Sequence, residues 1–73
     1  MFNPKIFGQR LLLLRKQRPG VTQVDIAKLL DVTPTQISDM ENGKTATTLA
    51  RLCLLCDYFN VSADYLLGRS DTP

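Results

Sequence analysis

Histidine and tryptophan are absent from the sequence, and only two of its 73 residues are cysteines. The lack of histidine removes the side chain that most often serves as a general base or as a metal ligand. The four glycines do not form a glycine-rich phosphate loop. Of the serines Ser38, Ser62 and Ser70, two are explained by a helix start or by the outer face of a predicted helix. We therefore expect no active site, no metal site and no cofactor, and an enzyme is the least expected class.

Long apolar runs are also absent. The run Leu11–Leu14 has only four residues and is flanked by arginines, whereas a membrane-spanning helix needs about 20 apolar residues. No signal-peptide pattern is present, which makes the cytoplasm the expected location and a membrane partner unexpected. A chain of 73 residues with 44% hydrophobic residues is enough for one small domain with one core.

A strong charge of either sign is missing, because the net charge is only +2. This excess does not by itself identify a partner, so the distribution of the basic residues matters more. Arg15, Lys16 and Arg18 cluster at the end of the first expected helix. They either complement the dipole of that helix or form part of a rim that faces phosphates.

What the sequence does contain is a pair of short helices joined by a tight turn, within residues 22–44. At each helix start, a threonine precedes an acid or amide by three residues, so that each side chain caps the other's backbone N–H. The two pairs are Thr22 with Asp25, and Thr33 with Gln36. Pro34 fits the first position of the second helix, and Gly43 fits the left-handed residue that ends it. This order of two starts and a stop predicts a helix-turn-helix unit.

Helical spacing of apolar residues predicts three further helices and an all-α fold. The first opens at Asn3 and Pro4 and ends at Pro19-Gly20, the fourth runs from Thr47 or Thr48 to about Asn60, and a short fifth begins at Ser62 and stops at Gly68. The residues expected to face the core are Phe7, Leu11, Leu14, Ile26, Ala27, Leu30, Val32, Ile37, Met40, Leu49, Leu52, Cys53, Cys56, Phe59, Val61, Leu66 and Leu67. We expect residues 1–68 to form one domain, with residues 69–73 as a tail or the start of a linker.

Cys53 and Cys56 form a C-x-x-C pair within the fourth predicted helix. A zinc site would need a second pair of ligands, and a thioredoxin-like site would need a preceding strand and a position at a helix start. Both cysteines fall on the predicted inward face. The pattern therefore favours two buried, reduced cysteines over a redox site.

The residues of this unit resemble a known family. The pattern T-Q-x-x-I-A-x-L-L-x-V-T-x-x-x-I-S-x-M-E-N-G-K at residues 22–44 resembles the DNA-binding domain of the Cro and phage-repressor (XRE) helix-turn-helix family, whose fold is lambda-repressor-like. The segment D-Y-F-N-V-S-A-D-Y-L-L-G at residues 57–68 resembles its last two helices, and residues 8–16 resemble its first. The resemblance implies a compact bundle of five helices that binds double-stranded DNA as a transcriptional repressor or regulator.

The second helix of the unit is the expected recognition helix. Helical spacing puts Thr35, Ser38 and Asp39 on its outer face, and Thr33, Pro34 and Gln36 at its exposed N-terminal end, where helix-turn-helix proteins contact bases. The expected phosphate contacts are Gln23, Asn42 and Lys44. The resemblance puts Thr33, Pro34, Thr35 and Asp39 at base-facing positions, and Gln23 and Lys44 at phosphate-contacting ones. Many relatives carry Arg or Gln at the positions of Pro34 and Asp39, and no arginine lies on this helix.

The resemblance also implies a buried or half-buried ion pair between Arg15 and Glu41, and a homodimer on a palindromic operator that forms in the free protein or only on DNA. The expected subunit contact is Val61–Leu67, with Leu54 adjacent, and the outward-facing Leu12 and Leu13 are a second candidate. The alternative function is a protein-interaction module, such as an antitoxin or anti-repressor, with weak or lost DNA binding. Because the carboxylate of Asp39 is repelled by phosphates, it supports this alternative, as do the exposed leucines.

Overall fold

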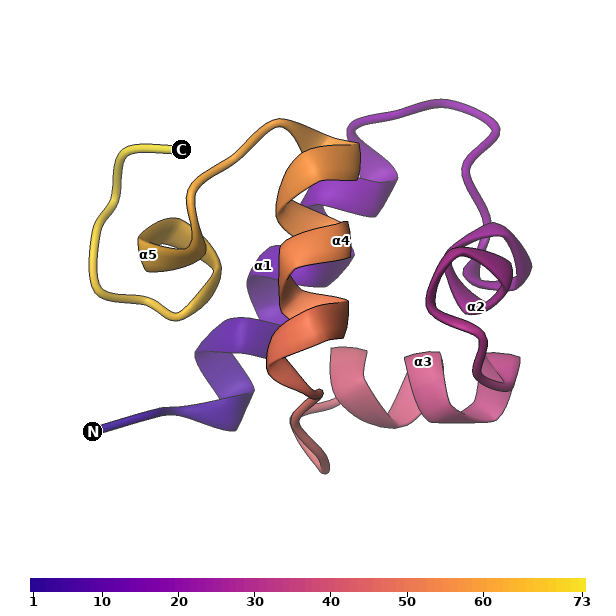
Figure 1. Ribbon diagram of the computed structural model, residues 1–73, viewed down its shortest axis with the longest axis horizontal. Coiled ribbons are helices and arrows are strands. Elements are labelled where there is room, and N and C mark those ends of the chain that lie inside the picture. The colour runs from indigo at the N-terminus through magenta and orange to yellow at the C-terminus, as the bar shows by residue number, and fades with distance from the viewer.

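Five helices and the loops between them make up the computed structural model, which describes residues 1–73. The helices are α1 (Pro4–Lys16), α2 (Gln23–Leu30), α3 (Pro34–Glu41), α4 (Leu49–Phe59) and α5 (Ala63–Leu66). In Figure 1, α2 and α3 lie on one side of α4, and α5 lies on the other. The predicted all-α, five-helix architecture is confirmed. No helix is long and apolar enough to span a membrane.

The capping residues set the ends of α2 and α3 as their sequence predicts. The backbone N–H of Thr22 donates to Asp25 at 2.9 Å, and that of Thr33 donates to Gln36 at 2.9 Å. The N–H groups of Asp25 and Gln36 donate back to the two threonine hydroxyls at 3.2 and 3.1 Å. Asp31 ends α2 in the left-handed conformation, with φ of 57°. An aspartate tolerates this conformation better than most residues, which lets the turn between α2 and α3 close without a glycine.

The core contains 13 buried hydrophobic residues, contributed by all five helices. Helices α1 and α3 approach each other closely at Gly8. A Cβ atom on Gly8 would lie 2.2 Å from the carbonyl oxygen of Met40 and 2.8 Å from that of Glu41. Only glycine fits there, because the obstacle is backbone that has no rotamer to change. Tyr65 on α5 is also buried, although its sequence position did not place it in the core.

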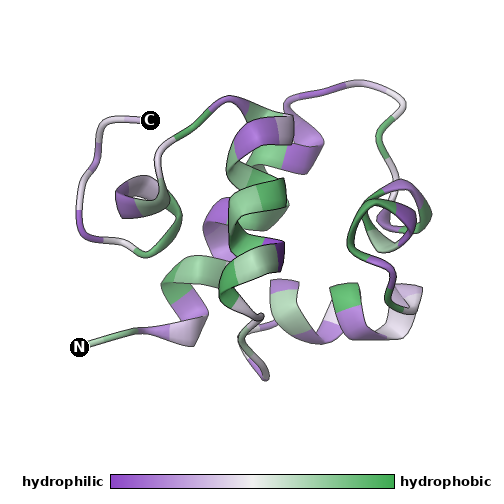
Figure 2. Cartoon of the chain, in the orientation of Figure 1, coloured by the Kyte–Doolittle hydropathy of each residue, from purple (hydrophilic) through white to green (hydrophobic).

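The buried face of α4 differs from the one that its sequence predicts. Leu52, Leu55 and Phe59 are buried, whereas Leu49 is 82% exposed and Cys53 is also exposed. Cys56 is half-buried, and both cysteines are free thiols. The buried stripe is therefore centred nearer to Leu55 than expected. Figure 2 shows why the pattern misleads, since most of α4 is hydrophobic and the apolar residues are not confined to one face.

Residues 69–73 fold back along α5 and α1. The guanidinium of Arg10 lies 4.5 Å from the centre of the Tyr65 ring and donates to the carbonyl oxygens of Tyr65 and Ser70. It also pairs with Asp71 at 2.8 Å. The N–H of Ser62 donates to the carbonyl of Pro73 at 3.2 Å. These contacts hold the last residues of the chain against the helical bundle.

Candidate nucleic-acid interface

The N-terminal end of α3 is exposed, and its outer face is polar. Ile37 and Met40 are buried against the core, which fixes the orientation of the helix. Six residues were expected to contact bases. The structure brings them together on the remaining surface of α3 and at its N-cap. Four of them are exposed and two half-buried: Thr33, Pro34, Thr35 and Gln36, and Ser38 and Asp39.

The capping box restricts what Gln36 can do. Its side-chain oxygen accepts hydrogen bonds from the backbone N–H of Thr33 at 2.9 Å and from the Thr33 hydroxyl at 3.3 Å. A bidentate contact with adenine needs that oxygen as an acceptor together with an amide N–H as a donor. While the cap is intact, Gln36 offers only its N–H groups. Thr35 and Asp39 keep side chains without a hydrogen-bond partner in the protein.

The three residues expected to contact phosphates lie at the ends of α2 and α3. Gln23 is the first residue of α2, and its amide nitrogen donates to Glu41 at 2.8 Å. Asn42 ends α3, and its amide nitrogen lies 3.4 Å from the hydroxyl of Ser38. Lys44 is exposed in the loop after α3. Gln23 is thus held in place by the protein, whereas the ammonium group of Lys44 is free to meet a ligand.

Arg15 and Glu41 form the ion pair that the resemblance implies. The Nε of Arg15 donates to Glu41 at 2.6 Å and its Nη2 donates at 3.1 Å, while the side chains are 15% and 4% exposed. The hydrogen bond to Glu41 raises the pKa of the Arg15 guanidinium, with a further electrostatic contribution from the same carboxylate. Since Gln23 donates to this carboxylate too, one buried group connects α1, α2 and α3.

The remaining basic residues near the end of α1 have different roles. The guanidinium of Arg18 lies 5.3 Å from the centre of the Tyr58 ring and 5.2 Å from that of Phe59, and it donates to the carbonyl of Tyr58 at 2.8 Å. Arg18 therefore ties the loop after α1 to the end of α4, whereas Arg15 ties α1 itself to α3. Only Lys16 of the cluster is exposed without such a contact, so Lys16 alone remains a candidate for a rim facing phosphates.

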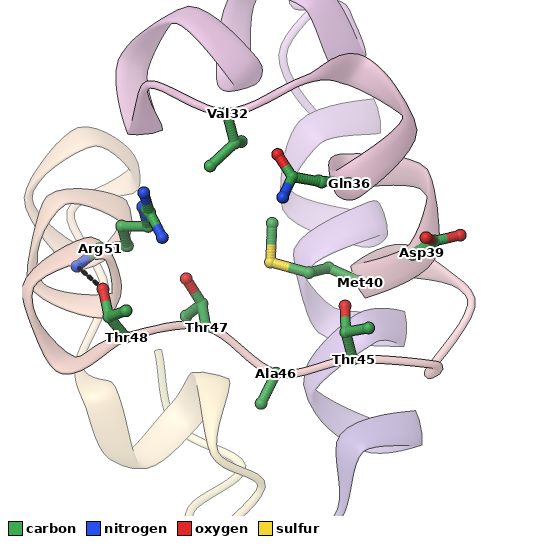
Figure 3. Close-up of a pocket in the computed structure, with 9 residues that line it drawn as sticks. All are labelled: Val32, Gln36, Asp39, Met40, Thr45, Ala46, Thr47, Thr48 and Arg51. Atoms are coloured by element: carbon green, nitrogen blue, oxygen red, sulfur yellow. Dashed lines mark hydrogen bonds between the residues drawn. The ribbon is translucent and has the colours of Figure 1, made fainter.

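A cleft of about 340 Å³ separates α3 from the loop that leads into α4. Figure 3 shows the side chains of Gln36 and Met40 pointing into this cleft and the carboxylate of Asp39 pointing away from it. Arg51, in the first turn of α4, forms part of the opposite wall, and its Nε donates to the carbonyl of Leu30 at 3.0 Å. Sequence reasoning missed Arg51, because no local pattern brings α4 to this side of α3.

Comparisons with known proteins agree with this geometry. The family model described as helix-turn-helix, HTH_3, matches residues 11–66. The transcriptional regulator PrpR of Mycobacterium tuberculosis is 41% identical over 64 residues, which are 88% of this chain and 13% of PrpR. The regulator RamB of the same species is 29% identical over 65 residues, 89% of this chain and 14% of RamB. The chain therefore spans about one-seventh of the length of these curated relatives.

Two solved structures have the same arrangement of helices. The P22 c2 repressor, in complex with a synthetic operator, superposes with a TM-score of 0.77 at 28% identity, covering 88% of this chain and 96% of the repressor chain. A structure of the SOS-response repressor LexA from Eubacterium rectale gives a TM-score of 0.80 at 26% identity, covering 89% of this chain and 68% of that one. Both superpositions cover nearly the whole domain.

Proposed function

We propose, from the membership of this chain in the helix-turn-helix family HTH_3, that it binds double-stranded DNA sequence-specifically and acts as a transcriptional repressor or regulator of the Cro and phage-repressor type. The observation that supports this most is the exposed polar end of α3, which a buried ion pair and two capping boxes hold in a fixed orientation. A rigid, capped helix end of this kind is what a major groove accepts. The relatives PrpR and RamB are named as transcriptional regulators, and the P22 c2 repressor is bound to an operator.

In this proposal, the outer face of α3 selects the base pairs. The methyl group of Thr35 packs on a thymine methyl, or its hydroxyl bonds to a base edge, and the carboxylate of Asp39 accepts from the amino group of cytosine. Pro34 adds van der Waals contact only, because it has no donor. Gln36 donates from its amide N–H while its oxygen stays in the cap. The operator should therefore contain a cytosine opposite Asp39.

Phosphate contacts at both ends of the motif fix the register of α3 on the duplex. Lys44 supplies the positive charge, and Gln23 and Asn42 supply neutral donors. Gln23 is aimed by its hydrogen bond to Glu41, so its second amide hydrogen points in a defined direction before DNA arrives. This pre-organisation reduces the loss of side-chain freedom on binding.

Three substitutions separate the roles of charge and of base contact. Lys44→Ala should weaken binding to all sequences alike and reduce the salt dependence by about one phosphate contact. Thr35→Ala should change preference at one base position, by about 1–3 kcal/mol at most. Asp39→Ala should relax the preference for cytosine and raise non-specific affinity, because it removes a repulsive charge. A Lys44→Ala variant with altered sequence preference, beside a Thr35→Ala variant with none, would contradict this division.

We also propose that two copies bind one palindromic site. The domain is 27 Å in its longest dimension and has one recognition helix, whereas the half-sites of a dimeric helix-turn-helix protein are about 34 Å apart. Within the expected seam Val61–Leu67, Tyr65 and Leu66 belong to the core, so Val61 and Leu67, which are only half-buried, are the large apolar side chains left for a partner. Leu67 also lines an apolar groove of about 250 Å³ beside Phe2 and the exposed Leu49. We therefore extend the seam to this groove.

Sedimentation of the protein with a palindromic duplex tests this assembly. The expected result is two copies per duplex, and Leu67→Asp should lower the affinity for the full palindrome while leaving binding to a single half-site unchanged. Val24→Asp is a matched control, because Val24 is 47% exposed on α2 and lies outside the seam. A complex of one copy per palindromic duplex at saturation would contradict the dimer. Leu54, which is 42% exposed, and the patch of Leu12 and Leu13 would be tested next by the same substitution.

The alternative function, a protein-interaction module with weak or lost DNA binding, is supported by the apolar side chains that the fold leaves exposed. Leu13 is 48% exposed and Leu49 is 82% exposed. A gel shift against random duplex at low and moderate salt separates the two functions, because phosphate contacts make affinity fall steeply with salt. No binding at any salt would favour the module.

A further inference from the structure

α3 itself has no basic residue, since its sequence is PTQISDME. On the side of the cleft beside α3, an arginine is supplied instead by α4. Arg51 is half-buried in the first turn of α4 and reaches the C-terminal end of α2, where its Nε donates to the carbonyl of Leu30 at 3.0 Å. The cleft thus has a cation on the wall that faces the recognition helix.

Most of the donor capacity of Arg51 is unused. A guanidinium has five N–H groups in a rigid fork, and in this protein Arg51 uses only the Nε hydrogen. The hydrogen bond to Leu30 holds the fork from one side, so the Nη groups are directed rather than free to rotate. Figure 3 shows the guanidinium at the wall of the cleft, opposite Gln36.

The other polar groups around the cleft are also able to donate. The oxygen of Gln36 is occupied by Thr33, which leaves its amide N–H groups for the cleft. Thr45 and Thr47 contribute hydroxyls. The one carboxylate nearby, that of Asp39, points away from the cleft (Figure 3). A cleft with an arginine fork, an amide and hydroxyls as donors matches an oxyanion, and arginine pairs with phosphate through two parallel hydrogen bonds.

We propose that Arg51 binds a phosphate of the DNA backbone next to the base pairs that α3 contacts. This inference rests on the proposed function and adds to it a contact from α4, outside the helix-turn-helix unit. Because the same guanidinium holds the carbonyl of Leu30, the phosphate, α4 and the end of α2 become linked through one side chain. DNA binding then stabilises the turn between α2 and α3 in the position that the groove requires.

The salt dependence of binding tests this role separately from a structural one. In Arg51→Met, the loss of the charge should reduce the slope of log affinity against log salt by about 0.9, the value for one phosphate. Arg51→Lys should keep most of the slope, because the charge remains, and should bind more weakly than the native protein, because the fork is lost. Arg69→Met is the matched control: Arg69 is exposed beyond α5 and makes no side-chain hydrogen bond, so its slope should equal that of the native protein.

The outcomes are distinct. A purely structural Arg51 would lower the melting temperature of Arg51→Met and leave the native slope, which would overturn the inference while the proposed function stands. Failure of the native protein to bind duplex at any salt would overturn both. Titration with inorganic phosphate alone, at constant ionic strength, separates the two sources of the anion. We expect no saturable binding there; saturable binding that Arg51→Met abolishes would assign the cleft to free phosphate and overturn the DNA contact.

Discussion

Replacing Glu41 with alanine should destabilise the domain severely, because it removes the single carboxylate that connects three helices. The side chain of Glu41 is 4% exposed and accepts hydrogen bonds from Arg15 at 2.6 and 3.1 Å and from Gln23 at 2.8 Å. No other acceptor in the protein binds these donors. The change therefore leaves a guanidinium that is only 15% exposed without a counter-ion.

The expected loss follows from this burial. Removing one partner of a buried ion pair costs about 3–5 kcal/mol, and the partial exposure of Arg15 puts the value near the lower limit, about 3 kcal/mol. A domain of this kind has a free energy of unfolding of about 5–15 kcal/mol. Since 1 kcal/mol shifts the melting temperature of a small domain by about 4–8 °C, the melting temperature should fall by about 12–24 °C.

Urea unfolding followed by circular dichroism measures this loss without a tryptophan. Asp57→Ala is the control, because Asp57 is an exposed acid on α4, and its change should stay within about 0.5 kcal/mol. The double variant Arg15→Met/Glu41→Leu replaces both charges with apolar groups and should be more stable than Glu41→Ala alone. A loss below about 1 kcal/mol for Glu41→Ala, or a double variant less stable than the single one, would refute this reasoning.

Three further predictions concern packing, pH and thiol reactivity. Gly8→Ala should abolish folding or lower the free energy of unfolding by several kcal/mol, because its Cβ would overlap backbone oxygens. Gly20→Ala, with φ of 85° but open space around it, should lower the free energy of unfolding by only about 1–2 kcal/mol. Thermal unfolding compares the two variants. The backbone hydrogen bond from Thr22, and then that from its hydroxyl, lower the pKa of Asp25 from 3.8. The stability that charged Asp25 contributes is therefore complete above pH 3.8 and is lost as the pH falls below it. When unfolding is followed during an acid titration, Asp25→Asn should lose less stability over this pH range than the native protein. Iodoacetamide should modify the exposed Cys53 before Cys56, since burial, and then the nearby Cys53 and Asp57, raise the pKa of the Cys56 thiol; equal rates in a mass-spectrometric time course would contradict this.

Local rules explain why the ends of α2 and α3 were predictable. Each capping box lies within four consecutive residues. The left-handed residues Asp31 and Gly43 stand at the end of α2 and just after α3, where the local sequence predicts a helix end. The buried face of α4 was not predictable in the same way. Leucines and cysteines surround much of that helix, so the apolar period alone does not choose a face, and packing against α2 and α5 decides it.

The site shows the same division between local and distant information. The sequence predicted both a cap and a base contact for Gln36, and the structure shows that its one carbonyl oxygen already serves the cap. Arg51 lies 21 residues from Leu30 in the chain, so no spacing rule connects it with the turn or with α3. The pairing of Arg15 with Glu41, separated by 26 residues, was expected because each follows a predicted core residue, Leu14 or Met40, and because the family resemblance implies an ion pair there.

Binding of duplex DNA by the exposed end of α3 can be measured by a fluorescence-anisotropy titration of a labelled random duplex over a series of salt concentrations. We expect measurable affinity at low salt, and the logarithm of the affinity should fall linearly with the logarithm of the salt concentration. The two charged contacts proposed for each copy, from Lys44 and Arg51, correspond to a slope of about −1.8 per bound copy. An absence of binding at every salt concentration, or an affinity that does not change with salt, would contradict DNA binding by α3 through these phosphate contacts.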